Sequence, residues 1–176
     1  MIALGLVALA PAAPVRAGGL EIIPSIGMSK GTDSNAGDAK FSGGLALRAP
    51  VLPFLKLEAG IAYRQASLTA NNDVTLRVWP VTASAWPTPF PSVYMGGGVG
   101  WYRETIDYSA ALPFADATTS KLGEHVGAGV LFPIGPKLGL DVSGRYVFMQ
   151  KDNDLHLPTT FNPDVWSASA GLAIKF

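Results

Sequence analysis

The sequence predicts an all-β fold, an eight-stranded antiparallel up-and-down transmembrane β-barrel. Three observations predict it: apolar residues recur at every second position, these alternating segments number eight, and charged residues are scarce. Of the 176 residues, 15% are charged and 48% are hydrophobic, whereas an average soluble protein has roughly 25% charged residues. After the N-terminus, no run reaches the ~18 apolar residues that a membrane-spanning helix needs. The apolar surface is therefore expected to lie on strands.

The first seventeen residues, MIALGLVALAPAAPVRA, predict a signal peptide that is cleaved after Ala17. A short apolar run is followed by small residues, with Val15 and Ala17 at the positions that a signal peptidase reads. Pro11 and Pro14 would interrupt a helix, and the run is too short to span a membrane. The chain is thus divided into a signal peptide, residues 1–17, and one barrel domain, residues 18–176.

Eight alternating segments follow, each of about ten residues, and clusters of Gly, Pro, Asn and Asp separate them. They are Leu20–Ser29, Lys40–Ala49, Phe54–Gln65, Val74–Ala85, Val93–Arg103, Leu122–Phe132, Lys137–Met149 and Asp164–Phe176. The connections at one end are short and proline-rich: Pro50–Pro53, Trp86–Pro91 and Pro133–Pro136. The connections at the other end are longer and polar: Lys30–Ala39, Ser67–Asp73, Thr105–Ser120 and Lys151–Pro163. Short periplasmic turns and long extracellular loops are typical of outer-membrane barrels.

The fourth segment alternates less regularly because Pro80 interrupts it. Leu76 and Val78 are expected on the apolar face, with Arg77 on the opposite face. A β-bulge at Pro80 would then shift the register by one residue, so that Val81 and its alternate neighbours continue the apolar face.

The less apolar face consists of Gly, Ala and a few charged residues, which suits the narrow interior of a small barrel better than a water-exposed surface. The apolar face then points to lipid. Aromatic residues support this orientation because they gather at two levels, as expected where a bilayer meets water. One level holds Phe41, Tyr63, Trp101, Phe148 and Trp166, and the other holds Phe54, Trp86, Phe90, Phe132 and Phe176. A soluble lipocalin-like barrel with an apolar interior has the same periodicity and remains the alternative.

Strand parity predicts a network of charged residues inside the barrel. Its members are Glu21, Arg48, Lys56, Glu58, Arg64, Arg77, Asp141, Arg145 and Lys175. Buried charges must be paired, and the mixed signs predict a salt-bridge network that plugs the lumen. Glu21 and Lys175 are expected to meet where the last strand closes on the first. Glu124 falls on the lipid face, where an acidic residue is unfavourable except near the interface.

No catalytic, cofactor-binding or metal-binding residues are predicted. His125 has only glycines two residues away on its strand, so no neighbour on that strand completes a nucleophile and base pair. His156 is assigned to a polar loop. Asp33, Asp38, Asp152 and Asp154 lack the ligand spacing of a calcium loop, and the chain has no cysteine. Thirteen basic and thirteen acidic residues balance, so nucleic acid is not an expected partner.

The ending Ser169-Ala-Gly171-Leu-Ala-Ile174-Lys-Phe176 resembles the C-terminal signal that the barrel-assembly machinery reads. With the segments VYMGGGVGWY and GEHVGAGVLFP, the chain is similar to the small OmpA/OmpW-like outer-membrane β-barrel superfamily over residues 18–176. The assembly-signal residues would be Ser169, Gly171, Ile174 and Phe176. The resemblance implies a Gram-negative outer-membrane location, contact with outer-membrane lipid and lipopolysaccharide, and the barrel-assembly machinery as a partner during biogenesis. A monomer is expected, although the sequence itself carries no signal for the oligomeric state.

The expected function is that of a non-enzymatic integral outer-membrane protein with a plugged polar lumen and extracellular loops for surface interaction or envelope integrity. Passage of small hydrophobic molecules, implied by the OmpW side of the resemblance, is one alternative. It needs a continuous apolar tunnel, which a charged lumen would oppose. A soluble, periplasmic, lipocalin-like ligand binder is the other alternative.

Overall fold

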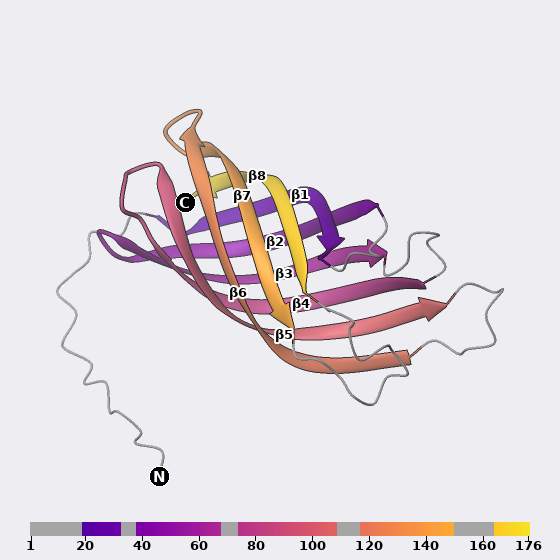
Figure 1. Ribbon diagram of the computed structural model, residues 1–176. Helices are drawn as coiled ribbons and strands as arrows, with labels where there is room; N and C mark the ends of the chain where they lie inside the picture. The colour runs from indigo at the N-terminus through magenta and orange to yellow at the C-terminus, as the bar shows by residue number, and fades with distance from the viewer. Residues whose placement is uncertain (1–18, 33–37, 68–73, 109–116, 150–163) are drawn as a thin grey trace, which may run out of the picture.

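The computed structural model describes residues 19–32, 38–67, 74–108, 117–149 and 164–176 (Figure 1). These residues form eight strands: β1 Glu21–Gly31, β2 Ala39–Leu52, β3 Leu55–Ser67, β4 Val74–Pro87, β5 Val93–Tyr108, β6 Ala117–Pro133, β7 Leu138–Met149 and β8 Val165–Lys175. Each strand pairs antiparallel with its sequence neighbours, and β8 pairs with β1 to close the barrel. The predicted all-β, eight-stranded, up-and-down fold is confirmed.

Closure leaves every strand with two partners, which is what a barrel in hydrocarbon requires because an unpaired backbone group there costs several kcal/mol. Figure 1 shows β8, in yellow, returning to lie beside β1, in indigo. Among the described residues, no helix is long and apolar enough to cross a membrane.

The alternation predicted from the sequence separates two faces. Large apolar side chains point outward and are exposed, among them Ile26, Leu45, Ile61, Val81, Val99, Val126, Val142 and Leu172. Aromatic side chains are exposed toward both ends of the strands, at Phe41, Trp79, Trp101, Phe148 and Trp166 and at Phe54, Phe90, Phe132 and Phe176. An apolar exterior is the opposite of what a soluble lipocalin-like barrel needs.

Three predictions about strand β4 are wrong. Its pairing with β5 runs from Val74–Tyr108 to Ala85–Gly97 without a shift, so no bulge occurs at Pro80. Leu76 and Val78 therefore point inward and are each 3% exposed, whereas Arg77 points outward. Trp86, assigned to an aromatic level of the exterior, lies in the interior instead.

The physical reason is that the interior is not uniformly polar. Toward the end where β4 begins, buried side chains of Leu76, Val78, Val147, Met149 and Val165 form an apolar layer inside the barrel. Two apolar residues in β4 thus belong inside, and hydropathy alone assigned them to the wrong face. The outward Trp79 packs on Tyr63 of β3, with ring centroids 4.9 Å apart.

Several strands extend beyond the predicted segments, β5 and β6 the furthest. β5 continues to Tyr108 and β6 begins at Ala117, so the ends of the predicted loop Thr105–Ser120 belong to strands. The predicted signal peptide lies outside the described residues, as do Asp33, Asp152, Asp154 and His156.

Candidate functional site

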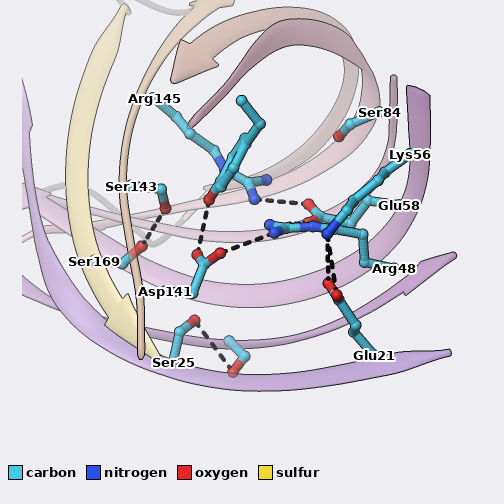
Figure 2. A network of polar contacts seen from close by, with 12 residues as sticks. Glu21, Ser25, Arg48, Lys56, Glu58, Ser84, Asp141, Ser143, Arg145 and Ser169 are labelled. Atoms are coloured by element: carbon cyan, nitrogen blue, oxygen red, sulfur yellow. Dashed lines mark hydrogen bonds and ion pairs between the residues drawn. The ribbon is translucent and has the colours of Figure 1, made fainter. Parts of the chain in front are cut away.

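The barrel interior contains a chain of ion pairs centred on Arg48 of β2 (Figure 2). Arg48 Nη2 lies 2.7 Å from Glu58 Oε2, and Arg48 Nη1 lies 2.8 Å from Asp141 Oδ2. Arg145 Nη2 lies 2.7 Å from Glu58 Oε1. Strands β3 and β7, which carry Glu58 and Arg145, are four strands apart in a ring of eight. They therefore stand on opposite sides, and the ion pair crosses the lumen.

A second group of charges lies where β8 meets β1. Lys56 Nζ is 3.0 Å from Glu21 Oε1, and Lys175 Nζ is 3.8 Å from the same oxygen. Glu21 and Lys175 are also directly paired in the β1–β8 register. The predicted meeting of these two residues across the closing seam is confirmed.

Aromatic rings pack against the guanidinium groups of Arg48 and Arg145. The Arg48 guanidinium lies 4.3 Å from the centroid of the Tyr94 ring, and the Arg145 guanidinium lies 5.1 Å from that of Trp86. Both distances are within the range of cation–π attraction. Tyr94 Oη also donates a hydrogen bond to Asp141 Oδ1 at 2.8 Å, so a tyrosine and an arginine hold the same carboxylate.

Glycines make room for these rings. A Cβ added at Gly129 of β6 would lie 2.3 Å from Tyr94 Oη, closer than any real contact. The glycine-rich pattern of β5 and β6 therefore allows large side chains to lie flat against the wall of a narrow barrel.

His125 has a partner that the sequence did not reveal. Ser84 Oγ of β4 lies 2.9 Å from His125 Nε2 of β6, and Tyr102 Oη lies 3.4 Å from Nδ1. Gly98 of β5 pairs with both Ser84 and His125. Because Gly98 has no side chain, the two residues meet across an intervening strand. A contact between residues two strands apart can be predicted only once the registers of both intervening strand pairs are known.

The structure brings seven of the nine predicted interior charges into ion pairs: Glu21, Arg48, Lys56, Glu58, Asp141, Arg145 and Lys175. Arg64 lines an interior cavity but forms no ion pair with a described residue. The placement of Arg77 inside the barrel is wrong, because Arg77 is exposed on the outside. An additional pair joins Lys121 to Glu104 at 3.3 Å.

The residues of the predicted assembly signal occupy both faces of β8. Ile174 and Phe176 point outward and are exposed. Ser169 points inward, where its hydroxyl lies 3.1 Å from that of Ser143. A Cβ at Gly171 would lie 2.6 Å from the Pro24 carbonyl oxygen, so only glycine fits against β1 there. Glu124 is exposed on the outer face, paired with Phe148, as the sequence predicted.

Within the described ranges, no group of three or more His, Cys, Asp or Glu side chains is placed to hold a metal ion. Ser84 and His125 resemble a nucleophile with its base, but both are buried, at 5% and 2% exposure. The hydroxyl on the other ring nitrogen of His125 belongs to Tyr102 rather than to an acid. The arrangement connects three strands inside the barrel.

Several solved structures are similar to this chain. Neisserial surface protein A is 19% identical, with a TM-score of 0.66, and the match covers 91% of this chain and 99% of that one. OprG of Pseudomonas aeruginosa is 15% identical, with a TM-score of 0.62 and coverage of 91% and 97%. Ail of Yersinia pestis, in complex with the heparin analogue sucrose octasulfate, is 17% identical, with a TM-score of 0.60 and coverage of 90% and 99%.

No curated protein sequence matches the chain. Residues 1–176 match the family described as "Outer membrane protein beta-barrel domain". The exposed apolar exterior, the closed antiparallel barrel and this match agree, and the chain belongs to the outer membrane protein beta-barrel domain family.

Proposed function

We propose that this protein is a non-enzymatic outer-membrane barrel whose lumen is plugged, so that the barrel serves as an anchor and the extracellular loops carry surface interaction or envelope integrity. The observation that carries this proposal is the Arg145–Glu58 ion pair, which joins opposite walls of the barrel. The fully buried Trp86, Arg48 and Tyr102 fill more of the same space. Charged side chains that pair with one another inside the barrel do not require a transported substrate as a partner.

Planar bilayer recording tests the plug. The purified, refolded protein should insert without steady ion current, while its mobility on an unheated gel shows that the barrel is folded. A double variant, Arg48→Ser with Arg145→Ser, removes both arginines that cross the lumen and should conduct if it still shows the folded mobility. Steady current through the wild-type barrel would contradict the plug.

The arginines outside the barrel suggest where lipopolysaccharide binds. Arg77 of β4 and Arg103 of β5 are exposed near Trp79 and Trp101, beyond the apolar band. Guanidinium groups suit phosphate, so we place the phosphates of lipopolysaccharide at this rim. Thermal unfolding in vesicles with and without lipopolysaccharide tests this placement. The rise in unfolding temperature caused by lipopolysaccharide should be smaller in Arg103→Gln than in wild type. It should be unchanged in Lys137→Gln, because Lys137 lies in a turn at the opposite end of the barrel.

Export and assembly complete the proposal. A signal peptide, residues 1–17, would direct the chain to the periplasm, and the exposed Phe176 at the end of β8 would be read by the barrel-assembly machinery. Phe176→Ala should lower the amount of folded barrel in outer-membrane fractions more than Phe132→Ala, a matched exposed phenylalanine at the same end of the barrel. Equal amounts for the two variants would contradict a role as signal. The protein is proposed to act as a monomer.

Passage of small hydrophobic molecules is the second candidate, and one observation favours it. A hollow of about 520 Å³ on the outer wall is lined by Val99, Leu122, Gly123, Glu124, Phe148 and Met149. Met149 also belongs to the apolar layer inside the barrel. The charged interior opposes an apolar path, so vesicles containing the protein should take up a hydrophobic dye no faster than empty vesicles. Faster uptake would favour passage over the anchor.

A further inference from the structure

A polar cavity of about 60 Å³ lies inside the barrel beside the ion-pair network. Side chains of Arg64 from β3 and Arg145 from β7 both line it. Five residues with hydroxyl groups also line it, Ser25, Ser42, Thr82, Ser167 and Ser169, together with glycines and apolar residues of β2, β3 and β4. A cavity of this size with several polar partners holds more than one water molecule, since a water occupies about 30 Å³ in the liquid.

The charges around this cavity do not balance. The acids near it already have basic partners: Glu58 binds Arg48 and Arg145, and Asp141 binds Arg48. Arg64 makes no ion pair or hydrogen bond with any residue in the described part of the chain. A guanidinium stays charged under all ordinary conditions. The cavity therefore has two positive side chains on its wall and an excess of positive charge.

An apolar layer separates Arg64 from the extracellular end of the barrel. A second hollow, of about 10 Å³, is lined by Ser29, Arg64, Gln65, Val78, Tyr102, Met149 and Val165, and its volume is at the lower limit of what a single water molecule needs. Val78, Met149 and Val165 are each buried. Arg64 thus lines both hollows, and the polar cavity is the one of the two with room for a partner of its charge.

The cavity also offers hydrogen-bond donors without partners of their own. Among the described residues, no hydrogen bond occupies the hydroxyls of Ser42, Thr82 or Ser167. A hydroxyl and a guanidinium can both donate to an anion. Water alone would satisfy the hydroxyls but would leave the charge of Arg64 uncompensated, which is costly in a low-dielectric interior.

The geometry points to a binding site for a small monovalent anion of the halide type, held between Arg64, Arg145 and the hydroxyls of the cavity. The volume suits one ion with a water molecule and is too small for a large organic anion. The ion would neutralise the positive charge that the protein's own acids leave over and would be a structural part of the plug.

Refolding with different anions tests the site without requiring an ion to enter a closed barrel. Wild type, Arg64→Gln and Arg103→Gln are refolded at one ionic strength with either bromide or the bulky anion gluconate, and urea unfolding is followed by gel mobility. Arg103→Gln is the matched control because Arg103 lies outside the barrel. Bromide should raise the unfolding midpoint of wild type and of Arg103→Gln, and this gain should be lost in Arg64→Gln, because only a ligand of the folded state stabilises it.

Anomalous diffraction from crystals grown in bromide locates the ion directly. A peak between Arg64 and Arg145 that is missing in Arg64→Gln supports the proposal. A cavity containing only water, or a bromide effect of equal size in all three proteins, overturns it. Because the readouts are an ion position and a stability difference, failure here leaves the conductance test of the plug unaffected.

Discussion

Arg48 and Glu58 face each other across the β2–β3 ladder: Nε of the arginine donates a hydrogen bond to Oε2 of the carboxylate at 2.8 Å, and Nη2 lies 2.7 Å from the same oxygen. The other carboxylate oxygen is left for Arg145, which reaches it from the opposite wall. One carboxylate thus pairs with two arginines, and opposite walls of the barrel are connected through it.

The first prediction concerns that shared acid. Glu58→Gln leaves Arg48 and Arg145 buried with one fewer negative partner, and removing one side of a buried ion pair costs about 3 to 5 kcal/mol. Urea unfolding in lipid vesicles, followed by the fluorescence of the four tryptophans, measures the loss. The matched control is Glu124→Gln, which removes an acid from the outer face and should leave stability unchanged or higher. Equal losses for the two variants would show that the network contributes no stability.

The second prediction concerns the space for Tyr94. Gly129→Ala places a methyl group 2.3 Å from the tyrosine oxygen, so the ring must move and its hydrogen bond to Asp141 is lost. We expect a loss of about 1 to 3 kcal/mol, as for other overpacked interiors. Gly144→Ala is the control, because the nearest atom to its new methyl group is 3.9 Å away. A tolerated Gly129→Ala would mean that Tyr94 has room to move.

The third prediction tests the direction of strand β4. Leu76→Ala should cost about 2 to 5 kcal/mol if its side chain is packed inside, whereas Arg77→Ala should change stability by no more than about 1 kcal/mol, as exposed charged residues do. Comparing the unfolding free energies of the two variants under one set of conditions shows which of the two residues faces the interior. The reverse order would mean that Arg77 faces the interior, as the sequence had suggested.

A fourth prediction separates a barrel in lipid from a barrel in water. Ile61 is exposed in the middle of β3, so Ile61→Arg should cost about 2 to 4 kcal/mol in vesicles if that surface meets the bilayer midplane. Phe132→Arg, toward the end of β6, should cost about 1 kcal/mol or less because the penalty falls near the interface. If arginine is tolerated equally at both positions, the exterior does not contact hydrocarbon.

The alternation of the sequence was sufficient to predict the strands, their number and most of their orientation. A period of two is easily recognised when one face is rich in Leu, Val and Ile and the other in Gly, Ser and Ala, as in β8. It fails where both faces are apolar. In β4, Leu76 and Val78 inside compete with Trp79 and Val81 outside, and hydropathy does not distinguish them.

The interior charges were found by parity, but their partners were only partly predictable. Glu21 and Lys175 follow from closure, because the first and last strands must pair. The contact of Arg145 with Glu58 depends on side chains that meet across the lumen, a distance set by the width of the barrel rather than by sequence spacing. The Ser84–His125 contact likewise depends on the registers of two ladders at once.

Gly98 separates Ser84 from His125 in the backbone ladder and lets them touch above it. A side chain at position 98 would collide with β4, since its Cβ would lie 2.0 Å from the Ala83 carbonyl oxygen and 2.7 Å from the Ser84 Cα. During evolution, changing the side chains at positions 84 and 125 would not relieve a collision with the backbone of β4. Relatives of this barrel with the same β4–β5 register should therefore keep glycine at position 98 even where the residues at 84 and 125 vary.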